Sequence, residues 1–226
     1  MTYTETFGPC GIGKSTNFSL LKSELKAISI QEHFARYSHS IFPSKHARTL
    51  GNRKLSALQK SEEFRRFLYL WLESHGEFQE LCGAIFSQKG GYYKKYKAYD
   101  QLRNRMELMF LLKFKKIDVS LNLLSDGGVI QSLYEFLPWN EEGLLILPKF
   151  LESIPLPDKI VFYQVDGPEI LVCRILKRKK TWGKMAACHF GRESELQDIV
   201  EKSIWFADKM HLLLRERMEV TKVHAI

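Results

Sequence analysis

The chain has 226 residues, of which 45% are hydrophobic, so it is long enough for one sizeable α/β domain with an insertion and short for two independent domains. No run approaches the roughly 20 consecutive apolar residues of a membrane-spanning helix, which argues against an integral membrane protein. The formal net charge of +8 implies attraction to anions such as nucleotides, nucleic acid, phosphorylated sugars or an anionic membrane surface, without choosing among them.

A segment near the start of the sequence matches a glycine-rich pattern. Residues 7–17 read FGPCGIGKSTN and fit the pattern G-x-x-x-x-G-K-[ST]. Residues 2–7 predict a short strand before it, and apolar residues at helical spacing predict a helix over 14–25 after it. This order of strand, loop and helix is the context that a phosphate-binding loop (P-loop) requires.

The rest of the chain alternates between strand and helix patterns. Further strands are predicted at 27–30, 119–128, 159–166 and 220–226. Helices are predicted as two runs within 61–86 that meet near Gly76, and over 100–116, 129–137, 144–154, 168–180 and 193–217. The alternation predicts a three-layer α/β fold with a parallel five-stranded sheet flanked by helices, in a single domain over 1–226.

Residues 34–116, between the second and third predicted strands, are expected to form a helical insertion. Within it, KGGYYKKYKAYD (89–100) breaks the helical pattern and predicts a surface loop. Its tyrosines are then expected to pack on neighbouring helices. The alternative is a surface that stacks bases or sugars, or contacts an anionic membrane.

The glycines of the P-loop allow turns that point successive N–H groups at a phosphate chain, and the following helix adds its positive end. Lys14 is expected to reach the β- and γ-phosphates, Ser15 to offer its hydroxyl to Mg²⁺, and Thr16 to lie near the α-phosphate. The predicted nucleotide-binding residues are Gly8, Pro9, Cys10, Gly11, Ile12, Gly13, Lys14, Ser15 and Thr16. A chance match to the pattern is the alternative.

Asp126 lies at the carboxyl end of the third predicted strand, where open α/β sheets place groups that contact ligands. Its carboxylate is expected either to hold Mg²⁺ through water or to accept a proton from a substrate hydroxyl. The alternative is a helix cap or turn residue before Gly127 and Gly128. Glu32, after the second strand, is a weaker candidate for the same neighbourhood, with a solvated loop carboxylate as its alternative.

Arg174 and Arg178 are four residues apart and therefore face one side of a predicted helix. Cations that close over a transferring phosphoryl group stabilise its charge, and the planar guanidinium of arginine suits this better than lysine. The alternative is a solvated charged face. Nearby lysines that extend the positive charge are Lys177, Lys179, Lys180 and Lys184.

The four cysteines, Cys10, Cys82, Cys173 and Cys188, are widely separated and form no C-x-x-C pair. This spacing predicts a reduced interior rather than a disulfide framework or a zinc site. The P-loop begins at Gly8, which leaves no room for a signal peptide before it in this sequence. We therefore expect a cytoplasmic protein.

The order of these features resembles P-loop small-molecule kinases of the thymidylate kinase and nucleoside kinase group. The segments that carry the resemblance are FGPCGIGKST, LLSDGGVIQSLYEF and VDGPEILVCRILKRKK. The resemblance implies ATP as phosphoryl donor, Mg²⁺, and an acceptor bound beneath the helical region. It also implies that Asp126 stands where the family has the Asp of its Asp-Arg pair, and that Arg174 and Arg178 belong to a lid at about 174–192.

Two departures from the family bear on the acceptor. Gly127 stands where thymidylate kinases carry the arginine that helps to bind the acceptor phosphate, which argues against dTMP. The insertion at 34–116 is also unlike a compact nucleotide kinase. Glu5, in the first strand, resembles an acidic residue of kinase-like proteins encoded with bacterial surface-polysaccharide genes. The basic charge of the chain would suit a phosphosugar or lipid-linked glycan acceptor.

These features favour an ATP-dependent phosphotransferase acting on a hydroxyl or phosphate of a small molecule, with a nucleotide-like, sugar or glycan acceptor. Lys14, Asp126, Arg174 and Arg178 are its predicted catalytic residues, and Ser15 and Asp126 its predicted metal ligands. One alternative is a P-loop ATPase or nucleotide-dependent switch acting on a macromolecule such as nucleic acid. Another is a nucleotide-binding interaction protein without turnover. A homodimer and contact with an anionic membrane surface stay open.

Overall fold

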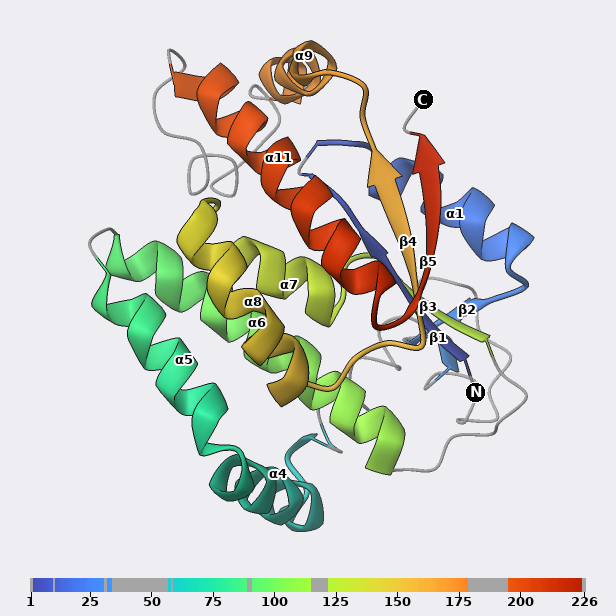
Figure 1. The fold of residues 1–226 in the computed structure, drawn as a ribbon. Coiled ribbons are helices and arrows are strands. Elements are labelled where there is room, and N and C mark those ends of the chain that lie inside the picture. Colours follow the sequence, from blue (N-terminus) through green and yellow to red (C-terminus); the bar gives the residue numbers. More distant parts are fainter. Residues whose placement is uncertain are drawn as a thin grey trace.

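The strand that leads into the P-loop lies at the centre of a parallel sheet. The computed structural model describes residues 2–9, 11–30, 32–33, 57, 59–88, 91–114, 122–178 and 195–224. The strands in these residues are β1 (Thr2–Phe7), β2 (Ile28–Ser29), β3 (Asn122–Ser125), β4 (Lys159–Gln164) and β5 (Glu219–His224). They pair in the order β2-β3-β1-β4-β5, and every pair is parallel (Figure 1). The expected α/β fold class is confirmed.

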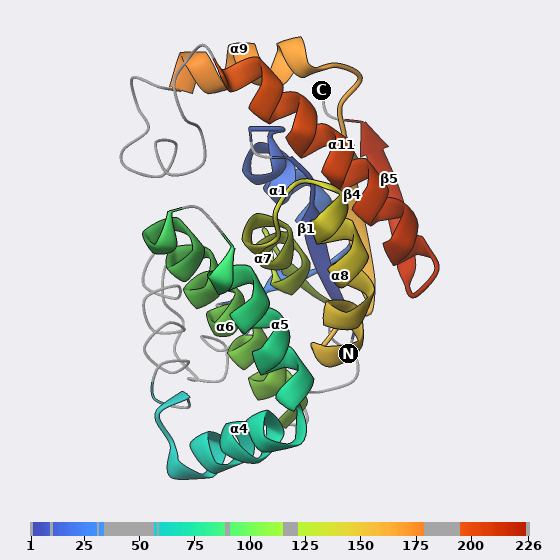
Figure 2. The same ribbon diagram turned by 60° about the vertical axis from the view of Figure 1, so that its left-hand side comes forward.

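Helices cover both faces of this sheet, as the two views of Figures 1 and 2 show. The helices that follow β1, β3 and β4 are α1 (Lys14–Glu24), α7 (Val129–Phe136), α8 (Glu141–Ser153), α9 (Pro168–Arg178) and α11 (Leu196–Arg215). Between β2 and β3 lie α4 (Glu62–Ser74), α5 (Gly76–Ser87) and α6 (Tyr92–Phe114). The helical region expected between the second and third strands is therefore present.

The side chains of β4 alternate between two hydrophobic cores, as expected for a strand covered on both faces. Ile160 and Phe162 belong to a large core that packs against α5, α6, α7, α8 and the second half of α11. Val161 and Tyr163 belong to a smaller core with α1, α9 and the start of α11. The P-loop residue Ile12 lies in this smaller core, so the loop is anchored by its own apolar side chain.

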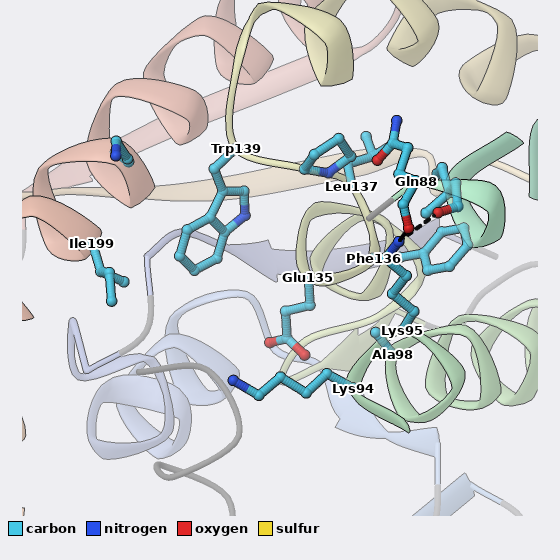
Figure 3. Close-up of a pocket in the computed structure, with 12 residues that line it drawn as sticks. Gln88, Lys94, Lys95, Ala98, Glu135, Phe136, Leu137, Trp139 and Ile199 are labelled. Atoms are coloured by element: carbon cyan, nitrogen blue, oxygen red, sulfur yellow. Dashed lines mark hydrogen bonds between the residues drawn. The ribbon is translucent and has the colours of Figure 1, made fainter. Parts of the chain in front are cut away.

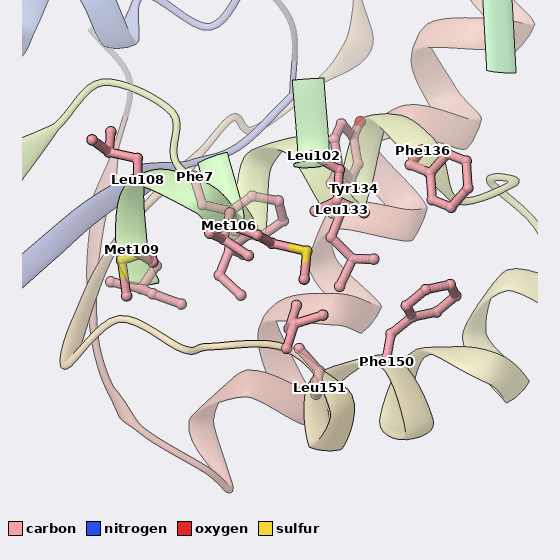
Figure 4. Packing of buried hydrophobic residues seen from close by; sticks show 14 of the residues in the cluster. Phe7, Leu102, Met106, Leu108, Met109, Leu133, Tyr134, Phe136, Phe150 and Leu151 are labelled. Atoms are coloured by element: carbon pink, nitrogen blue, oxygen red, sulfur yellow. The ribbon is translucent and has the colours of Figure 1, made fainter. Parts of the chain in front are cut away.

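Aromatic rings hold the large core together where β1 meets α7. The ring of Phe7 lies 5.5 Å from that of Tyr134 in an edge-to-face arrangement and 5.4 Å from that of Phe162. Figure 4 shows Phe7 and Tyr134 beside Leu133, with Phe136 and Phe150 packed farther out. Edge-to-face pairs of this kind add to the stability that burial alone provides. The end of β1, where the P-loop begins, is therefore anchored in the core by Phe7.

The prediction of a surface loop at 89–100 is wrong for its described part. Residues 92–100 form the beginning of α6, and Gly91 accepts hydrogen bonds from the backbone N–H groups of Lys94 and Lys95. Within the described residues, Gly91 lies outside the helix and directly before its first residue, Tyr92. Tyr99 does pack against Phe86 and Phe136, whereas Tyr93 and Tyr96 are 71% and 51% exposed.

The other predicted elements agree with the structure to within a few residues. The two helical runs predicted within 61–86 are α4 and α5, and they meet at His75, one residue from the predicted Gly76. The third strand is shorter than the predicted 119–128, and its first three predicted residues lie outside the described chain. None of the described helices is long and apolar enough to cross a membrane.

Candidate functional site

The P-loop leaves the carboxyl end of β1 and runs through three glycines in conformations that other residues rarely adopt. The φ angles of Gly8, Gly11 and Gly13 are +153°, +83° and +96°. A Cβ atom on Gly8 would lie 2.7 Å from the carbonyl oxygen of Tyr163, because the loop passes directly over β4. Gly13 is the N-cap of α1, so the loop delivers the chain to a helix N-terminus, where N–H groups attract anions. Cys10 lies outside the described residues.

Lys14, the first residue of α1, turns its side chain back over the loop. Its ammonium group donates hydrogen bonds to the carbonyl oxygens of Gly8, at 2.7 Å, and Pro9, at 3.1 Å. Ser15 and Thr16 follow in the first turn of the same helix. The loop thus gathers a cation, a hydroxyl group and a helix N-terminus in one small space, which suits a chain of phosphates.

Asp126 follows β3 and is held beside the P-loop strand by Thr6. The hydroxyl of Thr6 lies 3.3 Å from Oδ1 of Asp126 and accepts a hydrogen bond from the N–H of Gly127 at 3.1 Å. Gly127 has a φ of +73°, a left-handed turn that glycine adopts without strain. The predicted position of Asp126 at a strand end next to the P-loop is therefore correct.

A cavity of about 560 Å³ brings the predicted metal ligands Ser15 and Asp126 together. It lies between α1, the ends of β2 and β3, and α6. The residues that line it are Ser15, Phe18, Ser19, Lys22, Ser29, Glu32, Arg105, Leu124, Ser125 and Asp126. Hydroxyl groups, two carboxylates and two cations dominate this lining, so the cavity suits a polar, hydrogen-bonding ligand.

Glu32 also lines this cavity, as the weaker of the two carboxylates suggested by the sequence. Its carboxylate accepts hydrogen bonds from the ammonium of Lys22 at 2.5 Å and from the N–H of Ser29 at 2.9 Å. Burial raises the pKa of Glu32, but these hydrogen bonds and the charge of Lys22 outweigh it and leave the pKa lowered. Glu32 is therefore an ionised hydrogen-bond acceptor at neutral pH.

Helix α9 places Arg174 directly on the P-loop. Its guanidinium donates to the carbonyl oxygen of Ile12 at 2.9 Å. The neighbouring Ile175 packs on the other side of the loop, within 3.2 Å of where a Cβ on Gly11 would lie. The structure thus brings Arg174 together with the residues predicted to bind a nucleotide. The side chain of Arg178 and the predicted lid after it lie outside the description.

The oxygen donors present fit a Mg²⁺ ion held jointly by protein and phosphates. Among the described residues, no group of three or more His, Cys, Asp or Glu could hold a metal ion by itself. The Ser15 hydroxyl and the Asp126 carboxylate are hard oxygen donors lining one cavity. Mg²⁺ at phosphate sites takes one or two such groups and completes its octahedron with phosphate oxygens and water.

A second cavity, of about 360 Å³, shares no lining residue with the first. Figure 3 shows it between Trp139, Phe136 and Ile199, with Lys94 extending toward Glu135. Gln131 connects its wall to the P-loop, because its amide donates to Glu135 at 3.0 Å and accepts from the N–H of Gly8 at 3.2 Å.

Several residues of the site have no signal in the sequence. Thr6 and Gln131 touch the site across more than 100 residues of chain, and Arg105 reaches the cavity from the middle of α6. Polar residues in a strand or helix are too common to be selected without their partners. Thr6 and Gln131 become site candidates only once the structure shows their contacts, Thr6 with Asp126 and Gln131 with Gly8.

No protein-family model matches the chain, and no curated protein matches it either. Among solved structures, deoxyadenosine kinase from M. mycoides with bound dATP is similar over 100% of this chain and 91% of that chain, at 13% sequence identity and a TM-score of 0.49. The structure of that kinase with the products dCMP and a flexible dCDP matches 99% and 91% of the two chains, at 13% identity and a TM-score of 0.47. The structure with bound dCTP matches 99% and 90%, at 12% identity and a TM-score of 0.48.

Proposed function

We propose that this chain is an ATP-dependent phosphotransferase that moves the γ-phosphoryl group of ATP to a small acceptor. The observation that carries the proposal is the cavity shared by Ser15 and Asp126, which adjoins a P-loop held in place by Arg174. A nucleotide-binding loop alone would serve many functions. A polar cavity opening beside the loop, large enough for a second small molecule, distinguishes a transferase from a simple binding protein.

The donor side of the reaction rests on the P-loop. The N–H groups of the loop and the start of α1 bind the phosphate chain, and the Lys14 ammonium exchanges its carbonyl partners for phosphate oxygens. Bound Mg²⁺ would neutralise charge on the phosphates, with Ser15 and Asp126 as the residues that hold it. Arg174 lies where its guanidinium can stabilise charge on the transferring group.

The acceptor side rests on the carboxylates of the cavity. Glu32 is fixed by Lys22 and Ser29 and stays ionised, so it can accept a hydrogen bond from an acceptor hydroxyl and orient its oxygen. Arg105 adds a cation on the wall formed by α6. We propose that helices α4 to α6 form the acceptor side of a single domain and that a lid follows Arg174. The acceptor itself is a nucleotide-like, sugar or glycan molecule.

The proposal is tested by replacing Lys14. Purified protein is incubated with Mg²⁺, ATP and a panel of nucleosides (deoxyadenosine and deoxycytidine among them), nucleotides, sugars and lipid-linked glycans, and products are identified by mass spectrometry. Lys14→Ala is expected to lower phosphoryl transfer by about 100- to 1,000-fold, the usual cost of removing a charge-stabilising donor. Lys209→Ala, which removes an exposed lysine from α11, is the matched control and keeps its activity.

Two outcomes contradict the proposal. If transfer is unchanged in Lys14→Ala while the protein stays folded, the donor site is not the P-loop. If no acceptor is phosphorylated and ATP is hydrolysed only when DNA or RNA is added, the chain is an ATPase acting on nucleic acid. The assay with DNA or RNA is included because the net positive charge favours binding to nucleic acid.

A further inference from the structure

Glu5 is a buried carboxylate at the centre of the sheet, two residues before the end of β1. Its side chain has no exposed surface. One carboxylate oxygen accepts the N–H of Val129 at 2.8 Å and the other accepts the N–H of Ile130 at 3.0 Å. These are the first two residues of α7, so Glu5 caps the N-terminus of this helix from another strand.

Gly128 is the residue that makes room for this cap. Its backbone has a negative φ, so the left-handed conformation does not explain the glycine. A Cβ atom at this position would lie 1.9 Å from Oε1 of Glu5, far inside contact distance. The sequence Asp126-Gly127-Gly128 therefore contains one glycine for the turn and one for the Glu5 carboxylate.

The surroundings hold Glu5 in this single position. In the described part of the chain, no lysine or arginine forms an ion pair with it. Burial raises its pKa, and the N–H groups of Ile130 and Val129 and the hydroxyl of Tyr3 offset only part of that rise. A buried carboxyl group without hydrogen-bond partners would be costly. Glu5 is therefore held where it can accept hydrogen bonds from the start of α7.

The cap fixes the loop that carries Asp126. Thr6, the neighbour of Glu5 on β1, contacts the Asp126 carboxylate and the Gly127 N–H from below, while Glu5 holds the helix that follows. Two adjacent residues of the P-loop strand thus tie the Asp126 loop at both of its ends (β1 and α7 lie side by side in Figure 2). We infer that Glu5 is a positioning residue, which sets the place of the Asp126 carboxylate relative to the P-loop without touching a substrate.

The part of this inference that concerns catalysis rests on the proposed function, in which Asp126 helps to hold Mg²⁺. The inference also has a consequence for anion binding. The N–H groups of Val129 and Ile130 at the start of α7 already donate to the Glu5 carboxylate, so they are not available to bind a phosphate.

The test is a cycle of Glu5→Gln and Asp126→Asn, read out by calorimetric titration with ATP in the absence and presence of Mg²⁺. Each single variant is expected to reduce the gain in ATP affinity that Mg²⁺ provides by about 10- to 100-fold, the usual cost of losing a group that orients a metal ligand. The metal-free Kd stays within twofold of the wild-type value. The double variant loses no more than Asp126→Asn alone, because Glu5 acts through Asp126. Losses that multiply in the double variant, or no loss in Glu5→Gln, overturn the inference.

A readout independent of nucleotide separates this inference from the proposed function. Amide hydrogen exchange should speed up in Glu5→Gln at residues 126–130 while α8 is unaffected, and unchanged exchange at 126–130 rejects the positioning role. If ATP does not bind the wild-type protein, the proposed function fails, and the exchange result still decides the role of Glu5. Glu141→Gln is the control, since Glu141 is likewise a carboxylate near a helix N-terminus but is exposed.

A second variant covers the case in which Glu5→Gln does not fold. In the pair Glu5→Ala with Gly128→Ala, the new Cβ on residue 128 occupies space that the carboxylate leaves. It should fold, show the same faster exchange at 126–130, and lose the same Mg²⁺-dependent affinity. Wild-type exchange in this double variant overturns the inference.

Discussion

Gly8 shows how tightly the P-loop backbone is enclosed by the residues around it. Its N–H donates to the buried Gln131, and its φ of +153° lies outside the range that side chains favour. A Cβ atom would meet the carbonyl oxygen of Tyr163 at 2.7 Å, a backbone atom that cannot turn aside. Both the conformation and the space therefore require glycine.

Gly8→Ala is expected to destabilise the protein by about 1–3 kcal/mol, since it combines backbone strain with a clash. Because the strain falls on the P-loop, ATP affinity should drop as well, by on the order of tenfold, which corresponds to about 1.4 kcal/mol. Urea unfolding measures the first effect and titration with ATP the second. Wild-type stability in this variant would mean that the loop can move away from β4.

Gly83 provides the matched control for this substitution. It lies exposed in α5, and a Cβ added there would meet nothing within 4 Å. Gly83→Ala should therefore raise the free energy of unfolding by about 0.5–1 kcal/mol, because alanine loses less backbone entropy in a helix. ATP affinity should not change. The same substitution, glycine to alanine, is thus expected to lower the free energy of unfolding at position 8 and to raise it at position 83.

At the scale of elements, the first turns of α6 depend on a lysine that closes the end of α5. The ammonium of Lys95 donates to the carbonyl oxygens of Ile85, at 2.9 Å, and Gln88 (Figure 3, dashed lines). The last carbonyl groups of a helix have no i+4 N–H partner within it, and a cation near them interacts favourably with the negative end of the helix dipole. Lys94, the preceding residue, extends toward Glu135 in the second cavity.

Replacing Lys95 with methionine keeps most of the side-chain volume but removes both hydrogen bonds. Lys95→Met should lower the free energy of unfolding by about 1–3 kcal/mol, since two partly buried carbonyl groups each lose a hydrogen bond from a charged donor. Lys94→Met removes the same charge one residue away and should change stability by less than about 0.5 kcal/mol. Urea unfolding of the two variants distinguishes them. Equal losses would show that charge alone, and not the α5 cap, is at work.

The same helix shows what the sequence could and could not predict about the elements. The strand β4 follows from its apolar run and the helix α11 from its apolar spacing, because these apolar side chains are the ones buried in the fold. Residues 92–100 did not, since their tyrosines and lysines mask the helical period and Tyr93 and Tyr96 are largely exposed. Gly91, just before them, lies outside the helix. Local pattern thus predicts an element when its buried face is apolar.

The candidate site divides in the same way. Gly8, Gly13, Lys14 and Ser15 lie within one short segment, so their spacing alone predicts the P-loop. Asp126 could be predicted from its place after a strand. The contacts of Glu5 and Thr6 with the loop around Asp126 join residues about 120 positions apart, and they exist only because β1 and β3 are neighbours in the sheet. No local pattern encodes such a pairing.

At the scale of the whole molecule, the packing of α11 across the sheet buries a histidine whose protonation affects global stability. His211 is 5% exposed and its ring stacks on that of Phe162 on β4, with centroids 4.4 Å apart. Burial lowers the pKa of His211, and the positive charges of Lys222 and Arg215 lower it further. In the folded protein, the neutral imidazole is therefore favoured more strongly than in the unfolded chain.

The sign of the pH dependence follows from this lowered pKa. The unfolded chain binds a proton near pH 6.5, the ordinary histidine value, while the folded protein does so only at lower pH. The stabilising contribution of neutral His211 is thus complete above about pH 6.5 and is lost as the pH falls toward the folded pKa. Carboxyl groups whose pKa is raised by burial, such as Glu5 and Asp208, act in the opposite direction, because the folded state binds their protons more readily.

His211→Phe isolates the histidine contribution, since it keeps an aromatic ring against Phe162 and leaves the carboxyl groups in place. The free energy of unfolding, measured by urea at pH 8 and pH 5, should fall between these values by less in His211→Phe than in the wild type. Each unit by which the pKa of His211 is lowered accounts for about 1.4 kcal/mol of that difference. An equal fall in both proteins would show that the proton is taken up without disturbing the contact between α11 and β4. A smaller fall in the variant would make the packing of α11 on the sheet the acid-sensitive contact of the fold.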